Sequence, residues 1–170
     1  MVTTASSNWN VSKRRLLFVC TGNLCRSPLA VGFTKELLRA QGLEEKYEVA
    51  SAGTWTVDDH PPAPLAVAVM AERGIDISSH RSHSLTQKDV EDADLVVVMT
   101  RGHKEVLSLE FPQARSKIYL LSELAGENYD VEDPYGTESL ELYQECADQI
   151  AELLREGCGR LIELLEREKG

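Results

Sequence analysis

The sequence has few aromatic residues, no long apolar run and a minority of basic residues. Aromatic side chains make up only 6% of the 170 residues, so aliphatic side chains must fill most of the core. The apolar run Leu95–Met99 has the length of a strand, and every apolar run in the sequence falls far short of the roughly 18 residues that a membrane span needs. We therefore predict no membrane-spanning segment.

Basic charge is also scarce, because 18 basic residues face 28 acidic ones and leave a net charge of −10. This balance argues against binding to nucleic acid or to an anionic membrane surface. The first residues lack the apolar stretch of a secretory signal, so we expect a cytoplasmic protein. Four widely spaced cysteines are too few for a disulfide framework and do not have the paired spacing of a structural zinc site.

The order of predicted elements indicates an α/β fold. Residues 1–13 are polar and predict a flexible tail, and residues 14–170 predict a single domain. Short apolar runs predict strands at 16–19, 47–50, 95–99 and 117–121. Helical spacing and start signals predict helices from residue 28, from 61–64, after 86, over 101–109 and from 140 to 165. Strands that alternate with helices favour a four-stranded parallel sheet with helices on both faces.

The segment after the first strand, Cys20–Pro28, carries the chemistry. A loop that curls over a helix N-terminus points several backbone N–H groups into one cavity, which suits an oxyanion such as phosphate. Gly22 and Asn23 tolerate the left-handed angles that a tight loop requires. Arg26 can grip two phosphate oxygens. The same positive field should lower the pKa of Cys20 and favour its thiolate.

A cysteine at the end of a buried strand is often only a small core residue. Here the strand, the Gly-Asn loop, Arg-Ser-Pro and the helix occur together, which makes that interpretation unsatisfactory. The segment Cys20–Pro28 resembles the signature of low-molecular-weight protein tyrosine phosphatases, and Asp133–Gly136 resembles the family's Asp-Pro-Tyr signature. Ser51–Thr54 and Gly74–Arg81 also resemble family segments. The resemblance covers about residues 14–168 in the same order.

The resemblance implies a phosphotyrosine phosphatase that works in two steps without metal or cofactor. Cys20 would be the nucleophile and form a cysteinyl-phosphate. Arg26 would bind the phosphoryl oxygens, and Asp133 would protonate the leaving oxygen and later serve as the base for water. The partner would be a phosphotyrosine-containing protein, with tyrosine kinases among the targets of bacterial relatives.

Further roles follow from the same resemblance. The phosphate-binding loop would comprise Thr21, Gly22, Asn23, Leu24, Cys25 and Ser27. Within it, the hydroxyl of Ser27 would steady the thiolate, and Asn23 would hold the loop through hydrogen bonds. Ser51 and His80 would support Asn23, although Ser51 could simply close a strand and His80 could cap a turn.

The mouth of the site and the remaining cysteines have their own interpretations. Leu24, Trp55 and Tyr135 would wall the mouth, where an aromatic substrate ring could pack.

Cys25 would form a disulfide with the nucleophile under oxidants and protect it, and its alternative role is a small buried residue. Cys146 and Cys158 lie on the apolar seam of the last helix, which predicts core packing. His60, His83 and His103 show no ligand spacing and receive no role.

Three other functions compete with this interpretation. An arsenate reductase of the same fold relays electrons through two further cysteines well after the loop, but no cysteine occurs between Cys25 and Cys146. A protein-arginine phosphatase typically has threonine where Leu24 stands, and an apolar side chain there suits an aromatic ring. A non-enzymatic phosphate-binding module would lack the nucleophile or the acid, yet Cys20, Arg26 and Asp133 are all present.

Overall fold

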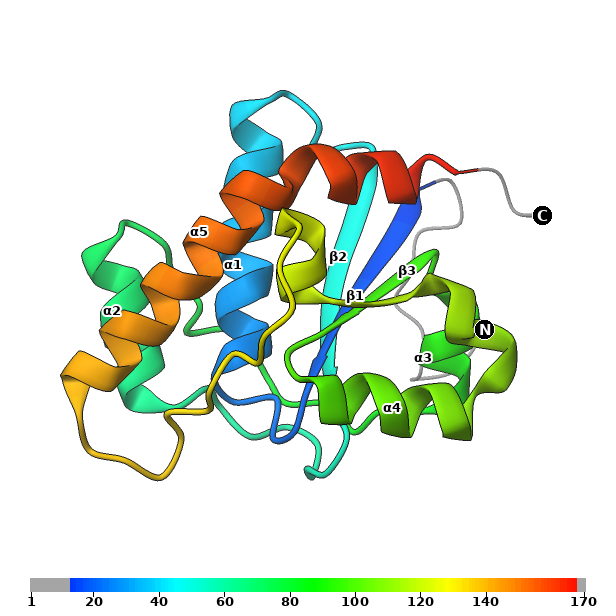
Figure 1. The fold of residues 1–170 in the computed structure, drawn as a ribbon. Helices are drawn as coiled ribbons and strands as arrows, with labels where there is room; N and C mark the ends of the chain where they lie inside the picture. Colours follow the sequence, from blue (N-terminus) through cyan, green and yellow to red (C-terminus); the bar gives the residue numbers. More distant parts are fainter. Residues whose placement is uncertain (1–12, 168–170) are drawn as a thin grey trace, which may run out of the picture.

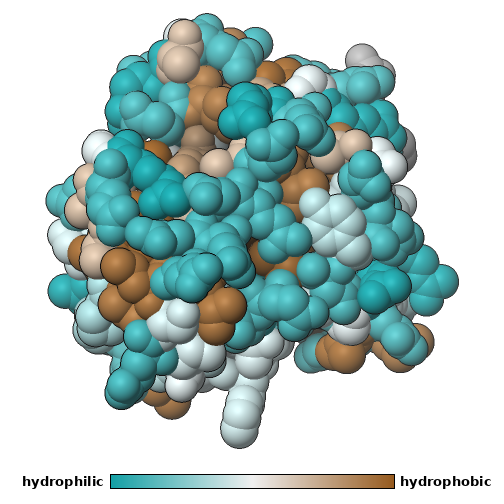
Figure 2. Space-filling model, turned by 60° about the vertical axis from the view of Figure 1, so that its left-hand side comes forward, coloured by the Kyte–Doolittle hydropathy of each residue, from teal (hydrophilic) through white to brown (hydrophobic). Residues whose placement is uncertain are grey.

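The computed structural model describes residues 13–167. All of the predicted tail except Lys13 lies outside these residues, so the tail remains a prediction. Among the described residues, no helix has both the length and the apolar character needed to cross a membrane. Where Figure 2 shows the surface, hydrophilic residues predominate and hydrophobic ones lie in small separate areas.

A four-stranded sheet lies at the centre of the molecule (Figure 1). Its strands are β1 (Arg14–Cys20), β2 (Tyr47–Gly53), β3 (Leu95–Val98) and β4 (Ile118–Leu120). They are all parallel and their order is β2-β1-β3-β4. The first strand is therefore central, and the segments that follow β1, β2 and β3 emerge at the same edge of the sheet, where ligands bind in open parallel sheets.

Helices cover both faces of this sheet (Figure 1). The α-helices are α1 (Arg26–Ala40), α2 (Pro64–Glu72), α3 (Gln87–Asp92), α4 (Arg101–Glu110) and α5 (Leu140–Leu165), and two 3₁₀ helices are η1 (Pro112–Lys117) and η2 (Leu121–Ala125). Helices α1, α2 and α5 share one apolar core, and α3, α4 and η1 share the other. The predicted α/β fold, with its parallel sheet and its two helical layers, is confirmed.

The alternation of side chains along β1 explains why there are two cores. Leu16 and Phe18 point into the core under α1, α2 and α5, whereas Leu17 and Val19 point into the core under α3 and α4. All four are at most 1% exposed. Burial of such a side chain stabilises a fold by about 1.5–3 kcal/mol, so this strand is anchored from both sides. Cys20, which ends the strand, is thereby held in a fixed place.

Two details differ from the sequence-based expectations. Helix α1 begins at Arg26, two residues before Pro28, because the loop runs into the helix without an intervening segment. Cys158 was expected in the core with Cys146, but it is only half-buried and its sulfur accepts a hydrogen bond from Gln41 Nε2 at 3.3 Å. The prediction holds for Cys146, which is 5% exposed, and it is wrong for Cys158.

Candidate active site

The thiol of Cys20 lies at the centre of the loop between β1 and α1. It is 2% exposed. Its Sγ lies 3.0 Å from Ser27 Oγ and accepts a hydrogen bond from the backbone N–H of Asn23 at 3.3 Å. Helix α1 starts immediately afterwards and carries no acidic residue in its first turn. The positive end of the helix dipole is therefore not neutralised at this place.

Opposing effects act on the pKa of Cys20. Burial raises the pKa of this thiol above its ordinary value, and this effect is the largest. The hydroxyl of Ser27, the guanidinium of Arg26 and the N–H groups of Ser27 and Asn23 lower it. The sequence-based expectation of a lowered pKa is therefore not met, because the positive field was considered there and the loss of hydration was not.

Asn23 holds the loop in shape from its centre. Its φ of 58° is left-handed, whereas Gly22, which could also tolerate such an angle, does not have a positive φ. The Nδ2 group of Asn23 donates to Ser27 Oγ at 2.7 Å and to Ser51 Oγ at 2.9 Å. The main-chain carbonyl oxygen of Asn23 accepts a hydrogen bond from His80 Nε2 at 2.7 Å. The structure thus brings Ser51 and His80 to Asn23, where the sequence analysis placed them.

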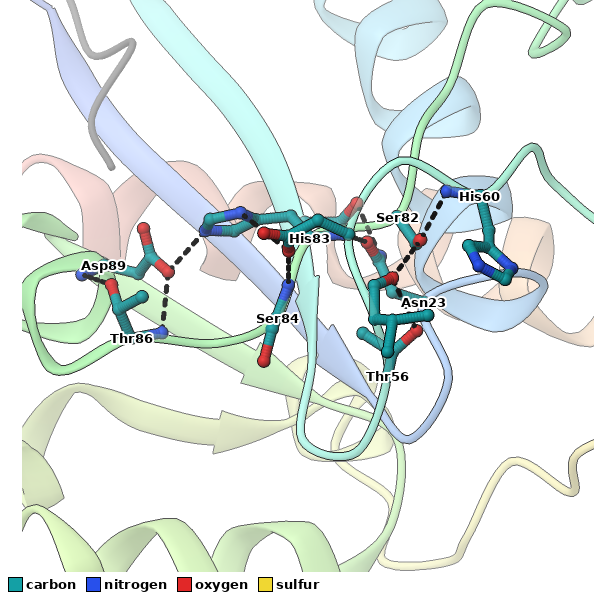
Figure 3. Close-up of polar contacts among 11 residues, drawn as sticks. Asn23, Thr56, His60, Ser82, His83, Ser84, Thr86 and Asp89 are labelled. Carbon is teal, nitrogen blue, oxygen red and sulfur yellow. Dashed lines mark hydrogen bonds and ion pairs between the residues drawn. The ribbon is translucent and has the colours of Figure 1, made fainter. Parts of the chain in front are cut away.

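A second layer of polar contacts fixes Asn23 from the outside (Figure 3). The backbone N–H of His83 donates to Asn23 Oδ1 at 2.9 Å. The ring of His83 is in turn held by Asp89 Oδ2 at 2.7 Å, and Asp89 also forms a capping box with Thr86 at the start of α3. Ser82 Oγ bonds the main chain of the loop after β2 on the other side. His83 therefore supports the loop, a role that the sequence analysis did not assign.

Arg26 connects the loop to the segment that carries Asp133. Its Nη1 donates to the carbonyl oxygen of Val131 at 2.9 Å, and its Nη2 lies 3.2 Å from Asp133 Oδ2. The guanidinium is 4% exposed and the carboxylate 36% exposed. Arg26 Nε is buried and has no hydrogen-bond partner among the described residues. Because a buried donor without a partner is costly, this N–H is suited to an oxyanion seated over the loop.

A cavity of about 510 Å³ opens above the thiol. It is lined by residues 20–26, Trp55, Thr56, Val57, Asp133 and Tyr135. Trp55 is 85% exposed and Tyr135 is 57% exposed, and Leu24, in the loop, is half-buried. The three predicted wall residues therefore all lie at the mouth, with Val57 as a further apolar wall. A larger groove of about 750 Å³ lies beside β2 and does not include Cys20, Arg26 or Asp133.

Cys25 is the last residue of the loop before α1 and is buried, and all four cysteines are free thiols. Contact with the thiol of Cys146 and burial both raise the pKa of Cys25. The raised pKa favours the neutral thiol of Cys25, which lies close to Cys146.

His103 also reaches the site, although the sequence analysis gave it no role. Its Nε2 lies 2.9 Å from Thr21 Oγ1, and Thr21 Oγ1 accepts a hydrogen bond from Arg26 Nη2 at 3.4 Å. Burial, followed by the nearby guanidinium of Arg26, lowers the pKa of His103 to about 4. The signal that could have found this residue is its place in the first turn after β3, the parallel neighbour of β1.

The comparisons with known proteins agree with this geometry. The family model described as "Low molecular weight phosphotyrosine protein phosphatase" matches residues 15–169. A protein-arginine-phosphatase of Bacillus subtilis (strain 168) is 38% identical over 83% of this chain and 92% of its own length. A probable low molecular weight protein-tyrosine-phosphatase, EpsP, of Ralstonia solanacearum is 38% identical over 72% of this chain and 79% of its own.

Among solved structures, the low molecular weight protein tyrosine phosphatase from T. tengcongensis is 41% identical and superimposes with a TM-score of 0.80. The match covers 89% of this chain and 99% of that one. The loop, the thiol at its centre and these similarities lead to one assignment. The chain belongs to the low molecular weight phosphotyrosine protein phosphatase family, whose members are cysteine-dependent hydrolases.

Proposed function

We propose that this protein is a protein tyrosine phosphatase that hydrolyses phosphotyrosine through a cysteinyl-phosphate on Cys20. The observation that carries the proposal is the position of the Cys20 thiol. It lies inside a loop of backbone N–H groups, 3.0 Å from Ser27 Oγ, and Arg26 and Asp133 face the same cavity. A thiolate held in an oxyanion cradle is placed to attack phosphorus.

In the first step the thiolate of Cys20 attacks the phosphorus atom. The S–P bond forms while the P–O bond to the substrate breaks. Arg26 and the loop N–H groups bind the equatorial oxygens and stabilise the charge that develops on them. Asp133 gives its proton to the departing oxygen, which leaves far better as a neutral phenol than as an anion.

In the second step water replaces the cysteine. Asp133, now a carboxylate, takes a proton from the attacking water, the S–P bond breaks, and phosphate leaves with the thiolate restored. The hydroxyl of Ser27 stabilises the sulfur as it carries charge again, and Asn23 keeps that hydroxyl in place through the 2.7 Å bond from its Nδ2. We assign no metal or cofactor to either step, because the loop and Arg26 supply the positive charge.

The preference for phosphotyrosine rests on the mouth of the cavity. Leu24, Trp55 and Tyr135 present an apolar side chain and two exposed rings around the opening. Such a surface favours contact with the flat face of a substrate ring. The substrate would be a phosphotyrosine-containing protein, with tyrosine kinases as one class of target.

A protein-arginine phosphatase is the second candidate. The observation in its favour is that two relatives, 38% and 35% identical, are named protein-arginine-phosphatases. The same cradle and the same nucleophile would serve a P–N bond. The residue that separates the two candidates is Leu24, where the second candidate is expected to have a threonine hydroxyl.

The experiment that separates the two candidates compares initial rates on a phosphotyrosine peptide and a phosphoarginine peptide, in reductant and without added metal. We expect a higher kcat/KM for phosphotyrosine in the wild type. The matched variant Leu24→Thr should shift the ratio of the two values toward phosphoarginine. A wild-type preference for phosphoarginine would overturn the substrate assignment and keep the nucleophile, and no hydrolysis of either peptide would overturn the proposal.

A further inference from the structure

His103 comes to the phosphate-binding loop from the other side of the sheet. It lies in the first turn of α4, the helix that follows β3, and its Nε2 is 2.9 Å from Thr21 Oγ1. Thr100 caps this helix, and its Oγ1 accepts the backbone N–H of His103 at 3.1 Å. The turn is further tied down because Arg101 bonds Asp130 through both its main chain and its side chain. The imidazole is therefore carried by a rigid turn.

Thr21 connects His103 to Arg26, because its Oγ1 contacts both side chains. Nη2 of Arg26 has two hydrogens and two protein partners, Thr21 Oγ1 at 3.4 Å and Asp133 Oδ2 at 3.2 Å. The two partners differ in how firmly they are held. Asp133 lies on the segment between η2 and α5 and is partly exposed, whereas Thr21 is fixed between β1 and His103.

The proposed reaction requires the contact between Arg26 and Asp133 to loosen. A protonated carboxyl that serves the leaving oxygen can no longer pair as an anion with Nη2, and a phosphoryl oxygen needs donors of the same guanidinium. Thr21 Oγ1 then remains the side-chain acceptor that orients Nη2. An unsupported guanidinium would lose part of its alignment at the moment when charge develops on phosphorus.

We propose that His103 is a positioning residue for phosphoryl transfer, which fixes the hydroxyl of Thr21 so that this hydroxyl keeps Arg26 in its oxyanion-binding orientation. The inference rests on the proposed function and deepens it. A neutral imidazole suits the role, because it adds no second positive charge that would repel Arg26. Burial and Arg26 itself keep the imidazole neutral at ordinary pH, since both lower its pKa.

The test uses three replacements of His103 together with Thr21→Val. His103→Ala removes the contact. His103→Gln places an uncharged amide close to the position of Nε2, whereas His103→Asn carries the same amide one methylene short of it. Each variant is measured for kcat and KM on p-nitrophenyl phosphate and for inhibition by orthovanadate, an oxyanion that tests the cradle without the leaving group. His60→Ala, an exposed histidine that bonds Ser82 through its main-chain N–H, is the matched control.

We expect His103→Ala and His103→Asn to lower kcat/KM by about tenfold, the effect of one lost hydrogen bond to a charged system. Inhibition by orthovanadate should weaken by a similar factor, and His103→Gln should recover most of both losses. In the background of Thr21→Val, His103→Ala should cause little further loss, because the two residues act through one contact. Equal losses for Gln, Asn and Ala, or fully additive losses with Thr21→Val, would overturn the proposal.

The outcome also separates this inference from the proposed function. If the wild type hydrolyses p-nitrophenyl phosphate through Cys20 and the His103 variants match His60→Ala, the positioning role is wrong and the nucleophile stands. If hydrolysis by the wild type does not depend on Cys20, the proposed function fails and the inference fails with it. Circular dichroism and thermal unfolding of each variant identify a loss that comes from misfolding, and His103→Gln then carries the test.

Discussion

Ser27 Oγ lies 3.0 Å from the sulfur of Cys20, and both atoms are buried. The hydroxyl is itself oriented by Asn23 Nδ2 at 2.7 Å, so it can donate its proton to the thiolate. Among the contacts that lower the pKa of Cys20, the one from this hydroxyl has the largest effect, and it opposes the effect of burial. This contact therefore increases the amount of thiolate that the site holds at a given pH.

Ser27→Ala should therefore raise the pKa of Cys20. A hydrogen bond to a charged group contributes about 1.5–3 kcal/mol, which corresponds to about one to two pKa units. The measurement is the pH dependence of the rate at which iodoacetate alkylates Cys20. Ser51→Ala is the matched control, because Ser51 contacts Asn23 and not the sulfur. An alkylation profile of Ser27→Ala that coincides with that of Ser51→Ala would contradict the role of the hydroxyl.

Asp133→Ala should slow the hydrolysis of poor leaving groups much more than that of good ones. A positioned general acid contributes roughly 10²–10⁴ in rate, and a leaving group that is stable as an anion does not need the proton. Rates on a series of aryl phosphates give a steeper dependence on leaving-group pKa in the variant than in the wild type. Glu132→Ala, an exposed neighbour, should leave the slope unchanged. Parallel slopes for Asp133→Ala and the wild type would remove Asp133 from the acid role.

Cys25 should protect Cys20 against peroxide. Peroxide oxidises the Cys20 thiolate to a sulfenic acid, and the thiol of Cys25 then displaces water to form a disulfide that a dithiol reductant can reverse. Without Cys25 the sulfenic acid advances to states that the reductant does not restore. The wild type should regain most of its activity in dithiothreitol after peroxide, and Cys25→Ser should regain much less. Equal recovery would show that Cys25 is only a core residue.

Acid should destabilise the fold partly through His103. Its pKa is about 4 in the folded protein and about 6.5 when unfolded. The unfolded chain therefore binds more protons between these values, and stability that is present above pH 6.5 is lost as the pH falls toward 4. The urea midpoint should fall less between pH 7 and pH 4.5 in His103→Gln than in the wild type. His60→Gln should fall as the wild type does, and an equal fall in His103→Gln would contradict the burial of a neutral ring.

The loop and its helix could be predicted from sequence because their geometry is local. Strand, loop, Arg26 and Pro28 follow one another without a gap, so the residue types alone constrain where the backbone N–H groups point. Asp133 lies 107 positions from Arg26, and its place at the loop came from the family resemblance rather than from spacing. The contact of Asp133 with Nη2 of Arg26 could be seen only in the three-dimensional structure.

His103 was missed because no motif surrounds it in the sequence, and only its place in the first turn after β3 could have indicated the site. It lies 82 positions from Thr21, and its partner is a hydroxyl that occurs in many loops. The contact arises because β3 pairs with β1 in parallel, so that the turn after β3 starts beside the turn after β1. The net effect on the pKa of Cys20 was missed for a related reason, since the extent of burial is a property of the packed structure and not of the loop's residues.

The most direct test of the central claim is turnover of a phosphotyrosine peptide by Cys20→Ser beside the wild type. We expect hydrolysis by the variant to fall to the level of a blank, because the serine hydroxyl is a far weaker nucleophile in the same cradle. Its thermal unfolding and its binding of inorganic phosphate should stay close to those of the wild type, since the loop and Arg26 are unchanged. Turnover that persists in a pure, folded Cys20→Ser preparation would contradict a cysteinyl-phosphate mechanism.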